Sequence, residues 1–135
     1  MNSPLASTGV SEFWGKRWNT AFRDLTHRFL FRPLTGVLGS RRATLAGFIF
    51  SGLVHDLVIS VPAGGGYGGP TLFFVIQGMA LLAERSPSGR AIGLGRGWRG
   101  KSFAFLVVIL PAYGLFHPPF VETIIVPFMR VLGAA

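Results

Sequence analysis

The chain has 135 residues, enough for one ordinary domain. Half of these residues are hydrophobic and only 13% are charged, whereas a soluble domain carries about 25% charged residues, so the composition predicts a membrane protein. The chain has no cysteine, which excludes disulfides, thiolate metal sites and cysteine nucleophiles. Its net charge of +8 is compatible with nucleic acid or a membrane surface until the cations are placed along the chain.

The N-terminal region predicts a flexible segment followed by an amphipathic helix. Residues 1–11 are small and polar, and Ser11 is positioned to cap a helix that begins near Glu12 and ends at Pro33. At 100° per residue, one face of this helix carries Trp14, Trp18, Phe22, Leu25 and Phe29. Because Lys and Arg lie opposite these rings, the pattern is typical of a helix in the membrane interface.

Four apolar segments follow, and together they predict an all-α integral membrane fold with about four transmembrane helices. The segments cover residues 43–61, 70–83, 102–116 and 120–132. The first has 19 residues and spans about 28 Å as a helix, close to the roughly 30 Å of a bilayer core. We expect loops or turns at 33–42, 62–69, 84–101 and 117–119.

The positive charges follow the predicted topology. Of the 13 Lys and Arg residues, seven lie at 16–42 and five at 85–101, and the turns at 62–69 and 117–119 carry none. With four crossings the remaining cation, Arg130, returns to the same side. This is the positive-inside pattern, so we expect a multi-pass protein with cytoplasmic basic loops. The cations then indicate lipid contact and topology, and no motif supports nucleic-acid binding.

His55 is the main candidate for chemistry. An ionisable residue inside a spanning segment is usually functional, and an imidazole that titrates near neutrality suits general-base catalysis. A hydrogen bond to a neighbouring helix is the structural alternative. Ser51 and Gly52 lie one turn earlier on the same face, where small residues leave room for a close helix or a substrate. Asp56 points about 100° away from His55, and its role stays open.

Asn19 lies at the edge of the apolar face of the first helix, where an ordinary polar boundary residue is the default interpretation. His27 and His117 are interpreted as an interfacial residue and a turn residue. The run GLGRG at 93–97 lacks the spacing of a dinucleotide motif, and no His and Glu spacing indicates a metal site.

Two stretches together carry a family resemblance: FWGKRWN at 13–19 and FIFSGLVHDL at 48–57. They resemble the wax synthase-like branch of the membrane-bound O-acyltransferases (MBOAT), and LFHPPFV at 115–121 resembles the end of that domain. The resemblance implies transfer of an acyl group from acyl-CoA to a lipid or long-chain alcohol hydroxyl. It makes residues 12–135 a wax synthase-like membrane domain, the C-terminal part of a MBOAT-type fold.

The resemblance also assigns site residues. It implies that His55 and Asn19 are catalytic, with His55 taking the hydroxyl proton and Asn19 orienting the thioester or stabilising its oxyanion. We expect substrate contacts from Trp14, Arg17, Trp18 and Ser51. Acyl-CoA is then a co-substrate, and neither a cofactor nor a metal is expected.

Relatives of this type have more spanning helices, so the resemblance implies a missing N-terminal half or a partner subunit. A first alternative is a non-catalytic, small multi-helix membrane protein or a subunit of a larger membrane complex. A second is a transporter or proton relay built on His55, Asp56 and Glu122, for which the FWGKRWN element has no purpose.

Overall fold

The structure is a computed structural model that describes residues 7–133, apart from the side chains of Thr20 and Phe22. Over these residues it is helical throughout, with turns and no strand, so the predicted all-α fold is confirmed. The elements are α1 (Val10–Glu12), η2 (Phe13–Arg17), α2 (Thr20–Thr26), η3 (His27–Phe31), α3 (Arg32–Leu38), α4 (Ser40–His55), η4 (Asp56–Ser60), α5 (Val61–Ala63), α6 (Gly69–Arg85), α7 (Pro87–Ala91), α8 (Gly97–Ile109), α9 (Ala112–Leu115), α10 (Pro118–Phe120), η5 (Val121–Ile125) and α11 (Val126–Val131), where η marks a π-helix.

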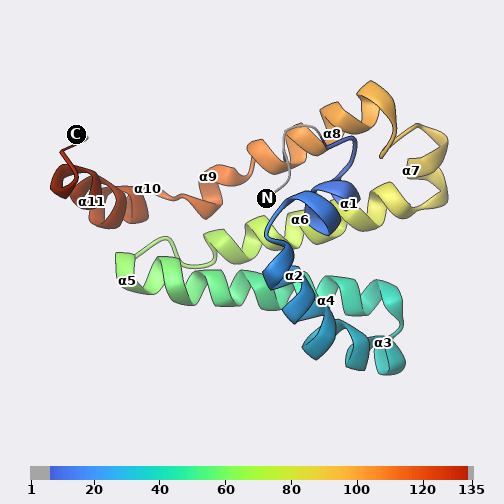
Figure 1. The fold of residues 1–135 in the computed structure, drawn as a ribbon, viewed down its shortest axis with the longest axis horizontal. Coiled ribbons are helices and arrows are strands. Elements are labelled where there is room, and N and C mark those ends of the chain that lie inside the picture. The colour runs from blue at the N-terminus through green and yellow to red at the C-terminus, as the bar shows by residue number, and fades with distance from the viewer. Residues whose placement is uncertain (1–6, 134–135) are drawn as a thin grey trace.

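Helices α4 and α6 lie side by side and antiparallel at the centre of the fold (Figure 1). Glycine permits their close approach, because a Cβ on Gly52 would lie 2.7 Å from the Cα of Thr71. A Cβ on Gly78 would similarly lie 3.0 Å from the Cβ of Phe48. Gly52 therefore leaves room for a neighbouring helix, which is one of the two roles that the sequence allowed.

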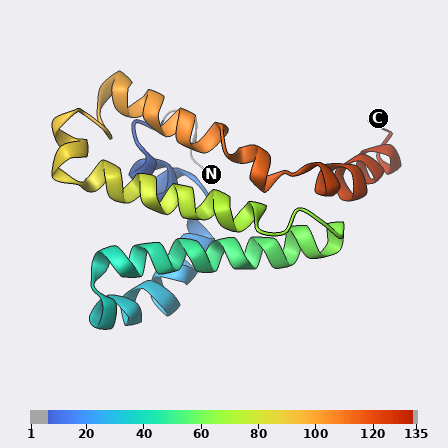
Figure 2. The ribbon, with the colours of Figure 1, turned by 180° about the vertical axis from the view of Figure 1, so that it is seen from behind.

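The long helices run back and forth between two ends of the molecule (Figures 1 and 2). The α3–α4 connection and α7 lie at one end, and both belong to the basic segments of the sequence. The charge-free turn between α5 and α6 lies at the other end. Helix α11, which carries Arg130, also lies at that other end, beyond a bend of 64° between Gly97–Leu115 and Pro118–Val131. The side of the membrane on which Arg130 lies stays a prediction.

One helix is long and apolar enough by itself to cross a membrane, within residues 7–133. It runs from Ser40 to Ala63 and has 24 residues, longer at both ends than the predicted span at 43–61. The bent pair Gly97–Leu115 and Pro118–Val131 passes the same test only when it is taken together. The predicted apolar segments are thus helical, and the number of crossings stays a prediction.

The N-terminal segment packs between α6 and α8. Val10 is fully buried in a small core with Ala80, Leu81 and Ala104. The predicted cap Ser11 is not used; the buried carboxylate of Glu84 accepts hydrogen bonds from the backbone N–H groups of Val10 (2.6 Å) and Ser11 (3.2 Å). Of the predicted flexible segment, residues 1–6 lie outside the described residues, and Val10 already begins α1.

The predicted continuous helix from Glu12 to Pro33 is wrong at two points. It is interrupted after Arg17, because Trp18 is extended and Asn19 has a positive φ of 35°. It also continues beyond Pro33 to Leu38, through most of the predicted loop at 33–42. Pro33 is tolerated because it lies in the first turn of α3, directly after the π-helical turn η3.

The turn between α5 and α6 is closed by side chains from η4. The Asp56 carboxylate accepts hydrogen bonds from the backbone N–H groups of Gly68 (2.9 Å) and Thr71 (3.1 Å), and from the hydroxyls of Ser60 and Thr71. Asp56 therefore caps the start of α6, which answers the question that its position in the sequence left open. Ser60 is also 3.2 Å from Nε2 of His117, which is buried and not simply a turn residue.

Candidate active site

A cavity of about 350 Å³ lies between the N-terminal elements η2, α2 and η3 on one side and α4 and α6 on the other. Rings from three separate parts of the chain make much of its wall, namely Trp14, Trp18, Phe31, Phe48 and Phe74. Its polar lining comes from Ser11, Asn19, Arg23, Thr26, His27, Thr44, Ser51, His55 and Arg85. The cavity therefore combines an aromatic wall with nine polar side chains.

The structure brings five of the six predicted site residues into this cavity. Both predicted catalytic residues line it, Asn19 from the break before α2 and His55 from the end of α4. Trp14, Trp18 and Ser51 also line it. These residues come from two stretches that are separated by more than one helix, so their convergence is a property of the fold. Their roles remain predictions.

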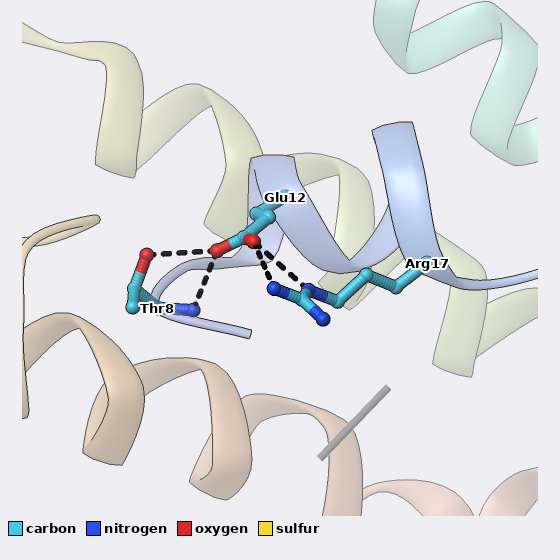
Figure 3. A network of polar contacts seen from close by, with 3 residues as sticks. All are labelled: Thr8, Glu12 and Arg17. Carbon is cyan, nitrogen blue, oxygen red and sulfur yellow. Dashed lines mark hydrogen bonds and ion pairs between the residues drawn. The ribbon is translucent and has the colours of Figure 1, made fainter. Parts of the chain in front are cut away.

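Arg17 is the sixth predicted residue, and it lies outside the lining. Its guanidinium donates hydrogen bonds to the Glu12 carboxylate from Nε (2.8 Å) and Nη2 (2.6 Å) (Figure 3). The backbone N–H and hydroxyl of Thr8 bind the other oxygen of Glu12, each at 2.8 Å. The Thr8 hydrogen bonds and the Arg17 guanidinium lower the pKa of Glu12 to about 2. Arg17 thus links η2 to α1 through its ion pair with Glu12.

The hydrogen bond of His55 determines its tautomer. Its Nδ1 lies 2.7 Å from the backbone carbonyl oxygen of Ser51, one turn earlier on α4. A carbonyl oxygen can only accept, so Nδ1 carries the proton and the lone pair of the neutral ring is on Nε2. Phe74 packs against the imidazole with ring centroids 4.4 Å apart. The ring is therefore oriented by α4 and supported by α6.

Asn19 owes its position to an unusual backbone conformation. It is the one described non-glycine residue with a positive φ, and asparagine tolerates this region better than most residues. Its carbonyl accepts the N–H of Arg23 at 3.1 Å, which starts α2. The chain thus turns at Asn19, and this turn places the residue at the cavity. Helical phasing placed Asn19 on a continuous helix and missed the turn.

Three cationic or ionisable side chains that we did not assign to the site also line the cavity: Arg23, His27 and Arg85. Arg23 is held by the Asp24 carboxylate (Nε to Oδ1, 2.8 Å) and by the carbonyl of Gly15. Arg85 donates from Nε to Oγ of Ser11 at 3.2 Å. The sequence interpretation assigned Arg23 and Arg85 to membrane topology and His27 to the interface, so it did not predict that they line the cavity.

Gln77 is a further residue that the sequence reasoning missed. It is fully buried in α6, where it accepts the indole N–H of Trp14 (3.2 Å) and donates from Nε2 to the carbonyl of Val107 in α8 (2.8 Å). A lone amide in the apolar segment 70–83 was the signal available in the sequence. It does not line the cavity itself, but it holds a residue that does.

Comparison with known proteins decides the family. Residues 1–76 match the model of the Membrane bound O-acyl transferase family, more than half of the chain. The chain belongs to this family. The resemblance seen in the sequence is confirmed, and the matched residues include all six predicted site residues. Members of the family are membrane-bound, in agreement with the apolar helix Ser40–Ala63.

The relatives of this family member are named as acyltransferases. The chain is 34% identical over 92 residues to probable long-chain-alcohol O-fatty-acyltransferase 2 of Arabidopsis thaliana, which covers 62% of the chain and 27% of the relative. It is 26% identical to probable long-chain-alcohol O-fatty-acyltransferase 9 of Arabidopsis thaliana, over 90% of the chain and 40% of the relative. It is 31% identical to acyl-CoA–sterol O-acyltransferase 1 of the same plant, over 42% of the chain and 19% of the relative. No solved structure matches the chain.

Proposed function

We propose that this chain carries the catalytic part of an acyl-CoA:alcohol O-acyltransferase that makes wax esters. The observation that carries the proposal is the convergence of Asn19 and His55 on one cavity with an aromatic wall. The relatives support the reaction class through their names, and one of them names acyl-CoA as the donor. The chain spans only 27% of the length of the first relative, so the activity of the whole protein is part of the proposal.

In this reaction His55 acts as the general base. Its Nε2 takes the proton from the acceptor hydroxyl as the hydroxyl oxygen attacks the thioester carbonyl carbon. The carbon–sulfur bond then breaks, the ester leaves, and the CoA thiolate takes the proton back from the imidazolium. The Asn19 amide donates to the carbonyl oxygen, where negative charge develops. The products are the ester and free CoA. The proposed reaction uses acyl-CoA as the co-substrate and involves neither a metal nor a cofactor.

The cavity supports an amphipathic donor. Its rings accept an acyl chain, and Arg23 and Arg85 provide positive charge for the CoA phosphates. Trp14, Trp18 and Ser51 contact the substrates in this proposal. Arg17 contributes through its ion pair with Glu12, by keeping the FWGKRWN element folded against the core.

The proposed protein is multi-pass, with its basic segments in the cytoplasm. In this proposal the four apolar segments cross the bilayer. Helices α4, α6 and α8 run between the basic end and the charge-free end (Figure 1), and the fourth segment, at 120–132, lies beyond the 64° bend. Elements α2 and η3 lie in the interface, because the apolar side chains of Leu25 and Phe29 are 57% and 68% exposed beside neighbouring arginines.

A second candidate is a non-catalytic membrane subunit, a helical protein that includes the apolar helix Ser40–Ala63. Further helices, on the same polypeptide or on a partner subunit, close the cavity in the first proposal. In the second, the chain packs with such helices but transfers nothing.

Incubation of membranes that contain the chain with labelled acyl-CoA separates the candidates. The first predicts labelled ester when a long-chain alcohol is added, and less ester with a sterol. The absence of any labelled ester, in the presence and in the absence of a co-expressed relative's N-terminal half, contradicts the first candidate and supports the second.

A further inference from the structure

The environment of Gln77 goes beyond the proposed chemistry. Its side chain is fully buried on α6, in the middle of an apolar segment. An amide buried in an apolar interior is unfavourable unless both of its ends find partners. Both do, because the indole N–H of Trp14 donates to Oε1 (3.2 Å) and Nε2 donates to the carbonyl of Val107 (2.8 Å).

The two partners leave the amide only one orientation. An indole N–H can only donate and a backbone carbonyl can only accept, so Oε1 must face Trp14 and Nε2 must face Val107. Gln77 therefore joins three elements, namely η2, α6 and α8. An aliphatic residue would fill the same space but could not hold the indole.

Trp14 transmits this constraint to the cavity. Its ring lies in the cavity wall and packs against Phe48 (ring centroids 5.6 Å apart) and Phe74 (5.5 Å). Phe74 in turn packs on the imidazole of His55, with centroids 4.4 Å apart. The chain of contacts from Gln77 to His55 thus passes through Trp14 and Phe74.

We propose that Gln77 is a positioning residue that fixes the Trp14 ring in the cavity wall and thereby sets the length of hydrocarbon chain accepted beside His55. This inference rests on the proposed function, because it assigns the cavity to acyl and alcohol chains. Gln77 itself touches no substrate, since it does not line the cavity. Its effect is on selectivity, through the one ring that it holds.

Three variants test the inference. Gln77→Met keeps the length of the side chain but removes both hydrogen bonds. Gln77→Glu keeps an oxygen acceptor for the indole and, in the protonated form that burial favours, an O–H donor for the carbonyl of Val107. Trp14→Phe keeps an aromatic ring but removes the N–H that Gln77 holds. With medium-chain and long-chain alcohols, we expect Gln77→Met to change the ratio of the two kcat/KM values by about threefold to tenfold, as the loss of one hydrogen bond allows. Gln77→Glu restores most of the ratio.

A double mutant separates positioning from general destabilisation. If Gln77 acts through Trp14, the combined Gln77→Met and Trp14→Phe variant changes the ratio no more than Trp14→Phe alone. Fully additive effects overturn the inference. The inference is also overturned if Gln77→Met lowers kcat/KM equally for every alcohol and Gln77→Glu does not restore it. Such a result indicates a purely structural role for Gln77.

A second measurement does not depend on turnover. Brominated fatty alcohols quench tryptophan, and the part of the quenching that Trp14 contributes is obtained by subtraction of the Trp14→Phe variant. We expect this part to depend on alcohol length and to change in Gln77→Met. If the chain makes no ester but shows this behaviour, the proposed function fails and the role of Gln77 in binding stands. Identical Trp14 quenching and emission in Gln77→Met and the unmodified chain overturns the inference.

Discussion

Asp56 binds Thr71 through its carboxylate, which accepts both the backbone N–H (3.1 Å) and the hydroxyl of that residue. This contact joins the end of α4 to the first turn of α6, immediately beside His55. The adjacent residues His55 and Asp56 therefore have different surroundings. The imidazole of His55 lines the cavity, and the carboxylate of Asp56 caps the start of α6.

Replacement of Asp56 is expected to lower stability. Asp56→Ala removes the acceptor for the first N–H groups of α6, and loss of a helix cap costs about 0.5–2 kcal/mol. Asp56→Asn keeps one oxygen and costs less. Thermal unfolding in detergent measures both, and acyl transfer per folded molecule is expected to stay close to that of the unmodified chain. Loss of turnover without loss of stability contradicts the capping role and revives the proton relay through Asp56.

The packing of α4 on α6 provides a second prediction. In Gly52→Ala the new Cβ would lie 2.7 Å from the Cα of Thr71, so the two helices must separate. We expect a loss of about 1–3 kcal/mol, the usual range for overpacking. The control is Gly36→Ala in α3, where no atom lies within 4 Å and the added methyl is neutral or slightly stabilising. Equal stability of the two variants contradicts the close helix contact.

The acidic titration of Glu12 gives a prediction about pH. Its pKa falls from an ordinary value of 4.5 to about 2 in the folded chain, chiefly through the hydrogen bonds from Thr8. A carboxyl with a depressed pKa stabilises the fold above pH 4.5, and this contribution disappears as the pH falls from 4.5 towards 2. Glu12→Gln removes this part of the pH dependence. The change is small because the side chain is partly exposed, and unfolding curves of the two proteins from pH 2 to 6 measure it.

Two substitutions of Asn19 distinguish the contribution of its backbone conformation from that of its side-chain amide. Asn19→Gly retains the positive φ of 35° without strain but removes the amide, so we expect folded protein with at least a hundredfold lower turnover, about the effect of a lost oxyanion donor. Asn19→Ala loses the amide and adds about 1–2 kcal/mol of backbone strain. Turnover and unfolding are measured on both. Full activity of Asn19→Gly shows that the residue matters only for the turn.

The sequence predicted the parts of the fold that depend on local patterns. Apolar runs predicted the helices, and the family resemblance carried by FWGKRWN and FIFSGLVHDL pointed to Asn19 and His55, which both line the cavity. Residues whose role depends on distant partners were missed. Glu84 caps a helix that begins 74 residues earlier, and Gln77 accepts a hydrogen bond from the indole of Trp14, 63 residues away. Hydrophobic periodicity reports only on neighbouring residues, so it cannot predict contacts between residues this far apart in the sequence.

The break at Trp18 and Asn19 was missed for a related reason. Residues 12–31 have a helical period, and a helix with one apolar face satisfies that pattern. In the fold, Trp14 turns inward against Phe48 and Phe74, whereas Leu25 and Phe29 remain exposed. One straight helix cannot face both directions, so the chain turns at Asn19.

Transfer from labelled acyl-CoA to a long-chain alcohol, measured in membranes with the unmodified chain and with His55→Ala, tests the central claim most directly. Gly36→Ala, where the added Cβ meets no other part of the described chain within 4 Å, controls for expression and insertion. The account predicts labelled wax ester with the unmodified chain and the control, and none above background with His55→Ala at equal protein levels. Ester formation by His55→Ala at the rate of the unmodified chain contradicts it.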